Sequence, residues 1–530
     1  MPRSRKAERP DEAASPRPTI VAAAGPVLAA LIRRERHRDD YWANKDPIVR
    51  DRLLWQAQSF RHLVHLLPGE SILELGAGHG WFSEAVLAVA KGRNPIVAAN
   101  FDPDVRLAKI KGIERVALDA LPGALAGRRF RFVVVQNLLD RDNAAELLAQ
   151  IHGWLEDGGR VVFFESNPWN AYFILRNFVL RLLRRPRPEL LLSQPELYEL
   201  LSEVGFVSIA ARFTDFVYAP LTTRLVWFFK NLSIVLENMP FVRTLAGRIL
   251  VIAQKPPRQV TRTPVSLCRH AKLKDSISVV VPCHNEAMNL GPLVDGLVGH
   301  YGDYLHQIVL VDDNSTDDTG AVMDALARRE PRITVVRRSP PNGVGRGLAD
   351  GFGATTGRYV LSMDCDFQHL LPELEDMFDA LADGADAVLG SRFSRLSVLI
   401  NYPFAKIVAN RAFHVAANIL FRFHRRDLTN NLKLMPGSFA RGLVIEEPGF
   451  AANAEIGLKL ALAGLDLREV PISWIDRGFD MGRSSFRVMA SGGGYVRVLM
   501  KLARKTVLGT RRADDAPTAE PPKRTRGKRR

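Results

Sequence analysis

Residues 277–286 read ISVVVPCHNE, an apolar and β-branched run followed at once by polar residues. A run of this kind is typical of a buried strand. The pattern returns as IVLV over 308–311, before DDNSTD, and as YVLSM over 359–363, before DCDFQH. Helical patterns separate these runs, so we predict an α/β fold with a largely parallel sheet in this half of the chain.

Acidic side chains follow the predicted strands, at the carboxyl ends where parallel sheets bind their ligands. Asp312 and Asp313 follow one strand, and Asp364 and Asp366 follow another. A lone Asp-x-Asp is often only a solvated turn, but here it is one of an ordered set. Hard divalent cations take oxygen ligands, and a bridging cation neutralises the charge that develops on a departing nucleotide diphosphate. We therefore predict a Mg²⁺ or Mn²⁺ site formed by Asp364, Asp366 and Gln368, with the two aspartates catalytic.

Further motifs follow in order: GSRF at 390–393, DLTNN at 427–431 and EVP at 469–471. With the acidic motifs, they resemble the family 2 glycosyltransferases of the GT-A fold, especially polyprenol-phosphate and dolichol-phosphate sugar synthases. The resemblance covers nearly all of 276–508 and implies transfer of a sugar from a nucleotide sugar. It also implies that arginines face the donor or acceptor phosphate, as arginine commonly does. The nucleotide-sugar-binding residues that it implies are Pro282, His284, Glu286, Asp312, Asp313, Arg392, Arg411 and Arg477.

Two departures from the family pattern leave the sugar unassigned. Ser485 stands where the family often has lysine, and DLTNN differs from the Thr-Ser-Gly-Phe form of the mannosyl synthases.

The acceptor can be argued from the charge of its attacking group. A lipid phosphate carries nearly two negative charges at pH 7 and needs no general base, whereas a sugar hydroxyl does. Glu455 is the candidate base, although it is equally compatible with an ordinary acid in the first turn of a helix. We favour a polyprenyl-phosphate lipid, and keep a glycan hydroxyl with Glu455 as catalytic base as the alternative.

The N-terminal half shows its own strand–glycine–helix pattern, with SILEL at 71–75, GAGHG at 76–80 and a helical pattern from Trp81. Glycines there let the backbone approach a ligand closely. Asp102 follows the next strand, 96–100, where a carboxylate could hold two ribose hydroxyls. The succession resembles the class I S-adenosylmethionine-dependent methyltransferases, which implies a Rossmann-like fold and this cofactor. The residues implied to bind S-adenosylmethionine are Glu74, Gly76, Gly78, Gly80, Asp102 and Asp119.

An alternative is that this half keeps the fold, has lost the chemistry and serves as a binding scaffold.

The organisation expected is a fusion of two α/β domains. We predict a disordered basic leader over 1–40, a methyltransferase-like domain over 41–254, a proline-rich linker over 255–275, a glycosyltransferase domain over 276–508 and a disordered basic tail over 509–530. The 530 residues, 47% hydrophobic and 25% charged, suit a soluble globular protein of this kind. Three cysteines are too few for a disulfide framework, which favours a reducing, cytoplasmic location.

The formal net charge of +16 favours anionic partners. No nucleic-acid-binding motif accompanies it, so we expect no specific nucleic acid. Three stretches, 172–185, 221–236 and 396–426, mix large apolar with basic residues, which is typical of helices on an anionic membrane surface. Each could also be an ordinary core helix. Since no apolar run of about 20 residues occurs, we predict peripheral binding at the inner face of the membrane and no spanning helix.

Overall fold

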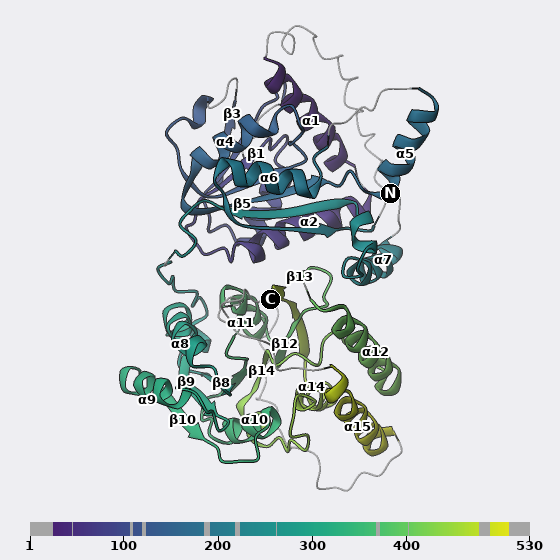
Figure 1. Cartoon of the computed structure of the whole chain (residues 1–530). Helices are drawn as coiled ribbons and strands as arrows, with labels where there is room; N and C mark the ends of the chain where they lie inside the picture. The colour runs from purple at the N-terminus through teal and green to yellow at the C-terminus, as the bar shows by residue number, and fades with distance from the viewer. Residues whose placement is uncertain are drawn as a thin grey trace, which may run out of the picture.

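The computed structural model describes residues 25–44, 46–105, 110–118, 123–184, 191–217, 223–260, 262–366, 371–400, 402–475 and 488–507. Figure 1 shows two α/β bodies, one above the other, formed by the N-terminal and C-terminal halves of the chain. Within the described residues, each half is centred on a seven-stranded sheet, and a two-stranded sheet accompanies the second.

The first sheet has the strand order β3-β2-β1-β4-β5-β7-β6, in which β7 runs antiparallel to both neighbours. The other pairings are parallel. Its strands are β1 (Ile72–Leu75), β2 (Ile96–Asn100), β3 (Ile113–Ala117), β4 (Phe130–Gln136), β5 (Leu155–Ser166), β6 (Val207–Thr214) and β7 (Arg248–Gln254). Its helices are α1 (Pro26–Trp42), α2 (Pro47–Leu63), α3 (Trp81–Val89), α4 (Ala144–Trp154), α5 (Ala171–Leu182), α6 (Gln194–Val204) and α7 (Thr223–Leu236), with short 3₁₀ turns at Gly123–Leu125 and Val242–Leu245.

The central strands of the first sheet are buried on both faces, which explains their largely apolar sequences. On β4, Val133 and Val135 belong to one hydrophobic cluster, and Phe132 and Val134 belong to another. Successive side chains of a strand point to opposite faces, so the two clusters lie on the two sides of the sheet. A parallel sheet covered on both faces requires continuous apolar runs of this type.

The second sheet has the order β10-β9-β8-β11-β14-β12-β15, with β14 antiparallel to β11 and β12. Its strands are β8 (Ile277–Cys283), β9 (Leu305–Asp312), β10 (Ile333–Arg337), β11 (Tyr359–Ser362), β12 (Ala387–Ser391), β14 (Lys433–Pro436) and β15 (Leu467–Pro471), while β13 (Val398–Ile400) pairs with β16 (Ser473–Ile475). The helices are α8 (Ala287–Tyr301), α9 (Thr319–Arg329), α10 (Val344–Gly353), α11 (Leu374–Ala382), α12 (Phe404–Phe421), α13 (Gly437–Arg441), α14 (Ala452–Leu462) and α15 (Val488–Val507).

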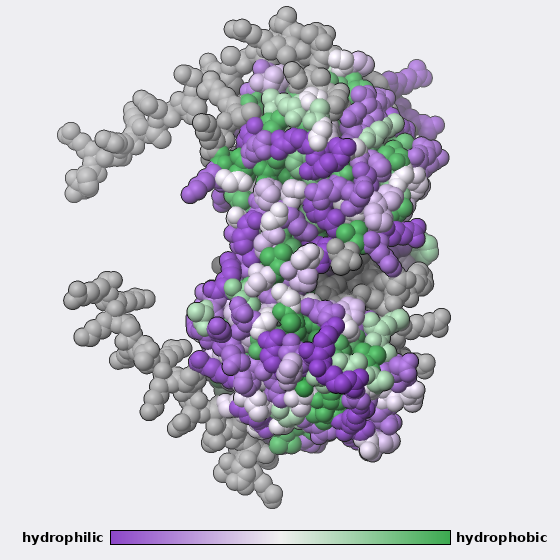
Figure 2. All heavy atoms as spheres, turned by 90° about the vertical axis from the view of Figure 1, so that its left-hand side faces the viewer, coloured by the Kyte–Doolittle hydropathy of each residue, from purple (hydrophilic) through white to green (hydrophobic). Residues whose placement is uncertain are grey.

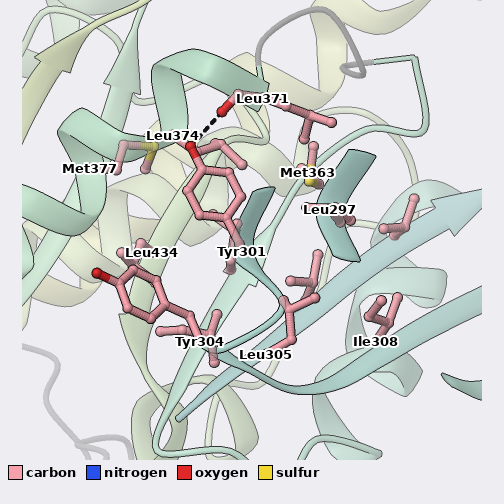
Figure 3. Close-up of a cluster of buried hydrophobic side chains, with 14 of the residues drawn as sticks. Leu297, Tyr301, Tyr304, Leu305, Ile308, Met363, Leu371, Leu374, Met377 and Leu434 are labelled. Atoms are coloured by element: carbon pink, nitrogen blue, oxygen red, sulfur yellow. Dashed lines mark hydrogen bonds between the residues drawn. The ribbon is translucent and has the colours of Figure 1, made fainter. Parts of the chain in front are cut away.

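Tyr301, at the end of α8, anchors the core of the second body (Figure 3). Its ring is fully buried and lies 5.0 Å from the ring of Phe378. Its hydroxyl donates a hydrogen bond of 2.6 Å to the carbonyl of Leu371. A buried tyrosine hydroxyl needs such a partner. The bond fixes the chain at Leu371, where the described segment that includes α11 begins.

The leader differs from the sequence prediction, and the predicted linker packs against both bodies. Helix α1 begins at Pro26, so the prediction of a disordered leader is wrong for the last part of 1–40. Pro26 at the first helical position suits a helix start, because that position needs no backbone N–H donor. Two residues of the predicted linker, 255–275, contact the two bodies: Arg262 donates to Glu70 at 2.9 Å, and Leu267 is buried in the second core.

Ion pairs join the two bodies. Arg61 of α2 pairs with Asp376 of α11 at 2.5 Å, and Lys91 lies 2.6 Å from the same carboxylate. Arg395 pairs with Asp51, which is fully buried. Burial raises the pKa of Asp376, but the nearby charges of Arg61 and Lys91 outweigh that effect and lower the pKa to about 2.

Among the described helices, none is long and apolar enough to cross a membrane.

Candidate active site

Three neighbouring parallel strands, β9, β8 and β11, carry the predicted site to one edge of the second sheet. After β8 come His284 and Glu286. Strand β9 ends at Asp312 and is followed by Asp313, and Asp364 comes two residues after the end of β11. Because parallel strands end at the same edge, residues far apart in the chain gather there.

Asp313 ties together the loops that follow β8 and β9. Its carboxylate accepts a hydrogen bond of 2.6 Å from the backbone N–H of Gly343 and pairs with Arg338. Its backbone carbonyl lies 3.0 Å from Nδ1 of His284. The buried Asp313 therefore links three segments at the sheet edge, while His284 is exposed.

The other acidic and apolar residues predicted here stabilise the same loops. Asp312 accepts a hydrogen bond of 2.9 Å from the backbone N–H of Ser315. The backbone N–H of Glu286 donates to Thr319 at 2.8 Å. Pro282 is buried within β8.

Asp364 and Asp366 lie directly after β11. Asp366 is buried, and Asp364 is half-buried and accepts a hydrogen bond of 2.8 Å from the side chain of Asn431. Asn431 belongs to the DLTNN segment, just before the antiparallel strand β14. Gln368 lies outside the described residues. Among the described residues, no group of three or more histidine, cysteine or acidic side chains could hold a metal ion. Two carboxylates nevertheless fit Mg²⁺, which commonly takes one or two carboxylates, substrate phosphates and water.

Arg392 forms an ion pair within the protein. Its guanidinium forms a bidentate pair with the buried Asp427, at 2.7 and 2.9 Å, and also donates to Thr429 and Tyr402. Burial lowers the pKa of Arg392, but the charge of Asp427 outweighs this effect and raises it. The pair organises the DLTNN segment, so phosphate contact by Arg392 stays a prediction.

Arg411, on α12, lies near this pair. Its guanidinium carbon is 3.9 Å from the centre of the Phe393 ring, and it donates to the Asn410 side chain at 2.5 Å. Burial lowers the pKa of Arg411 to about 10, so the side chain remains charged at neutral pH. Arg477 lies outside the described residues.

Glu455 is buried in the first turn of α14 and is fully engaged. Its carboxylate accepts hydrogen bonds from the backbone N–H groups of Glu446 and Glu447, at 2.9 to 3.1 Å, and pairs with Lys459 at 2.6 Å. These contacts match the alternative of an acid that stabilises a helix start and the loop before it. The role of general base stays an untested prediction.

Lys433 is a residue that sequence reasoning missed. It is completely buried at the start of β14, and its ammonium group donates to the carbonyl of Asn430. Burial lowers the pKa of Lys433 to about 7, while the charges of Asp427 and Asp364 act in the opposite direction. The signal in the sequence was its place two residues after Asn431, whereas its pairing with β11 is known only from the fold.

The N-terminal body has a second cluster, at the end of β1. Gly76, Gly78 and Gly80 adopt positive φ angles of 64°, 55° and 85°. L-residues with a side chain rarely adopt such angles, so the turn requires glycine. Burial raises the pKa of Glu74 to about 7, and Ser83 donates to its carboxylate. Asp102 lies nearby, after β2, whereas Asp119 lies outside the described residues.

Helix α1 occupies the space in front of this glycine turn. Arg36 donates to both carboxylate oxygens of Asp102, at 2.6 and 2.7 Å. The Glu35 carboxylate accepts from the backbone N–H groups of Gly78, Phe101 and Asp102, at 2.9, 2.7 and 3.1 Å. The groups predicted to hold the cofactor are thus bound to the protein's own helix.

Arg38 and Asp39 add further contacts from α1. Arg38 donates to the carbonyl of Gly76, and Asp39 accepts from the backbone N–H of His79 at 3.0 Å. A Cβ added to Gly78 would meet the Asp39 carboxylate at 2.4 Å. Helix and turn are therefore closely packed.

Comparisons with known proteins concern mainly the second body. Residues 278–442 match the model of glycosyl transferase family 2. The chain is 30% identical over 246 residues to polyprenol monophosphomannose synthase of Mycolicibacterium smegmatis, covering 44% of this chain and 87% of that protein. It is 28% identical over 230 residues to undecaprenyl-phosphate mannosyltransferase of Micrococcus luteus, covering 42% and 92%.

Solved structures are similar to each half at low scores. Glucosyl-3-phosphoglycerate synthase from Mycobacterium tuberculosis has a TM-score of 0.35 and 16% identity, covering 46% of this chain and 85% of that one. A SAM-dependent methyltransferase from Thermotoga maritima, a possible histamine N-methyltransferase, has a TM-score of 0.29 and 15% identity, covering 43% and 100%. Scores this low carry no argument. The family match and the 30% identity to the mycobacterial synthase, 87% of which is covered, show that this chain belongs, through its C-terminal half, to the family 2 glycosyltransferases.

Proposed function

We propose that residues 276–508 transfer a sugar from a nucleotide sugar to a polyprenyl-phosphate lipid, with Mg²⁺ or Mn²⁺. The observation that carries the proposal is that the family 2 match spans the three strand ends with their acids, alongside similarity to two synthases named for polyprenyl carriers. The sugar itself is not part of the proposal, because DLTNN departs from the mannosyl form and Ser485 departs from the lysine that the family often has.

In the proposed reaction, a phosphate oxygen of the lipid bonds to the anomeric carbon as the bond from that carbon to the nucleoside diphosphate breaks. The leaving diphosphate takes the electron pair. A divalent cation held by Asp364 and Asp366 would neutralise the charge that develops there. The loops around His284, Glu286 and Asp313 would hold the nucleotide.

No general base is needed for this acceptor, because a phosphate monoester is already largely deprotonated at pH 7. This chemistry agrees with the engagement of Glu455, whose carboxylate is committed to two backbone N–H groups and Lys459. The alternative, transfer to a glycan hydroxyl with Glu455 as base, would require those contacts to break during each turnover.

For the N-terminal body, we propose a domain of class I methyltransferase fold that binds S-adenosylmethionine only when α1 leaves the glycine turn. The strand order with its antiparallel β7 supports the fold, and the turn followed by Asp102 supports the cofactor. The contacts of Glu35 and Arg36 argue against binding in the conformation described. If α1 stays bound to the glycine turn, the domain serves as a binding scaffold without methyltransferase chemistry, which is the alternative stated above.

The test of sugar transfer uses the full chain, a panel of nucleotide sugars, Mg²⁺ or Mn²⁺, and two acceptors of equal chain length, a short polyprenyl phosphate and the corresponding polyprenol. Transfer to the phosphate alone is expected, and Asp366→Ala should abolish it. Asp295→Ala, at an exposed position on α8, is the matched control and should retain activity. Transfer to the polyprenol, but not to the phosphate, would refute the proposed acceptor.

A further inference from the structure

Helix α5 of the N-terminal body exposes its large apolar side chains. None of its 12 residues is buried. Leu175, Phe178 and Leu182 are 64%, 66% and 74% exposed, and Tyr172 is 61% exposed. In Figure 1, the helix stands away from the sheet at the right-hand edge of the molecule. A large, contiguous apolar patch that stays exposed is typical of an interaction site.

Helix α7 lies on the same side of the molecule as α5 in Figure 1. On α7, Leu225, Phe228 and Leu232 are exposed at a spacing of three and four residues, which places them on one face. Val226 and Ser233 are buried and, seven residues apart, share another side of the helix.

Helix α12 of the C-terminal body continues this surface below α7, and the two helices contact one another. Val408, Val415 and Ile419 of α12 are exposed. We call the exposed apolar residues of α5, α7 and α12 the three-helix face. The opposite side of the molecule is different: in Figure 2, hydrophobic residues there are scattered among hydrophilic ones.

The charges on these helices have one sign. The sequences of α5, α7 and α12 contain no aspartate or glutamate. Arg181 and Arg184 are exposed at the end of α5, and Arg176 lies over the ring of Phe173 at 4.7 Å. Exposed apolar side chains together with arginine, without acids, complement the surface of an anionic bilayer. A face built to bind a second copy of itself would place these arginines against one another.

The other side of α12 leads to the proposed active site. Asn410 donates to Thr429 at 2.7 Å, and His414 accepts from the backbone N–H of Leu428 at 2.7 Å. Both partners lie in the DLTNN segment, whose Asn431 holds Asp364. The exposed side of α12 therefore belongs to the three-helix face, and its inner side contacts the segment that supports Asp364.

We propose that the three-helix face docks on an anionic lipid bilayer, with α5 of the N-terminal body lying in the membrane interface. The domain fused in front of the glycosyltransferase thereby supplies a membrane anchor. Docking through α12 brings the phosphate of a membrane lipid to the side of the molecule where DLTNN and Asp364 lie. This last consequence rests on the proposed function, whereas docking itself does not.

The test measures co-sedimentation of the full chain with vesicles of phosphatidylcholine alone and with about one third phosphatidylglycerol. The variant Leu175→Ser/Phe178→Ser/Leu182→Ser removes exposed apolar groups and should fold, since none of the three is buried. Val444→Ser, 70% exposed but outside the three helices, is the matched control. A second variant, Arg181→Gln/Arg184→Gln, tests the charge.

We expect wild type and Val444→Ser to bind the anionic vesicles at least tenfold more tightly than the neutral ones. The triple variant should bind anionic vesicles at least tenfold more weakly, and the arginine variant should lose most of the preference for anionic lipid. Equal binding by wild type and the triple variant, or no binding by wild type, overturns the proposal. The proposal is also overturned if wild type and the control are dimers without lipid and the triple variant alone is a monomer. The three-helix face would then bind a second copy of the chain.

Sugar transfer to a short, water-soluble polyprenyl phosphate, without vesicles, is measured in parallel. The triple variant should keep this activity. Absence of transfer in wild type, together with normal vesicle binding, would refute the proposed function and leave the docking face intact.

Discussion

Releasing α1 should open the N-terminal body to an adenosyl ligand. The perturbation is Glu35→Ala/Arg36→Ala. It removes the carboxylate that accepts three backbone N–H groups and the guanidinium that holds Asp102 at 2.6 and 2.7 Å. S-adenosylhomocysteine would need the same N–H groups and the same carboxylate, so the ligand and α1 compete for them.

The size of the effect follows from these contacts. A hydrogen bond to a charged group contributes about 1.5–3 kcal/mol when buried, and an exposed ion pair about 0–1 kcal/mol. The Glu35 side chain is buried, whereas Arg36 is 29% exposed, so most of the bias comes from Glu35. Burial of the Glu35 carboxylate raises its pKa and opposes these hydrogen bonds, so we take the net bias as that of about one such bond, near 3 kcal/mol, which leaves the open state at roughly 1%. The apparent affinity of wild type for S-adenosylhomocysteine is lowered in proportion to the population of the open state. The double variant should therefore bind this ligand about 100-fold more tightly than wild type.

The assay is titration calorimetry of the full chain with S-adenosylhomocysteine. Arg33→Ala, at an exposed position of the same helix, is the matched control and should bind as wild type does. Equal affinity of wild type and the double variant would refute the competition. A double variant that keeps the wild-type melting temperature yet binds no adenosyl ligand would instead refute the assignment of S-adenosylmethionine to this domain.

Three further predictions concern the active site and the contact between the two bodies. Chelation by EDTA should abolish sugar transfer and added Mg²⁺ or Mn²⁺ should restore it in wild type, but not in Asp366→Ala; metal-independent transfer would refute the metal site. Glu455→Gln should keep transfer to lipid phosphate within about threefold while lowering the free energy of unfolding by about 1–3 kcal/mol, because it weakens contacts to backbone N–H groups; a loss of 100-fold or more in kcat, with the fold intact, would establish Glu455 as a base. Asp376, whose pKa of about 2 lies below the usual 3.8, stabilises the fold fully above pH 4 and loses this contribution as the pH falls from 4 to 2. Asp376→Asn should therefore cost about 3 kcal/mol near pH 7 and flatten the dependence over that window in acid-unfolding curves, because it leaves Arg61 without its carboxylate partner; an unchanged curve would contradict the pairing.

The strands that carry the active site were predictable from local sequence. The runs at 277–282, 308–311 and 359–363 fall on β8, β9 and β11, and the run at 96–100 is β2. Continuous apolar, β-branched segments followed by acids are a strong local signal, because a strand buried on both faces admits little else. The prediction of a family 2 glycosyltransferase, made from the motifs after these strands, is confirmed.

Other elements depended on partners distant in the chain. The antiparallel strand β14 comes after α12, yet it inserts between β11 and β12. Most of helix α1 falls within the predicted disordered leader, 1–40, whose basic and polar residues indicated a solvated segment. In the fold, those same residues meet the glycine turn and Asp102. Gln368, Arg477 and Asp119 lie outside the described residues and stay predictions.

The sequence by itself determined the order of the elements and the chemical type of each residue at the strand ends, because both follow from local patterns of hydrophobicity and motif. Only the tertiary structure decided which of those charged groups are engaged by other parts of the chain. Arg392 is bound to Asp427, Asp102 to Arg36, and Glu455 to the loop before its own helix. A charge buried in a medium of low polarity must find a partner, and the fold, rather than the motif, brings that partner within reach.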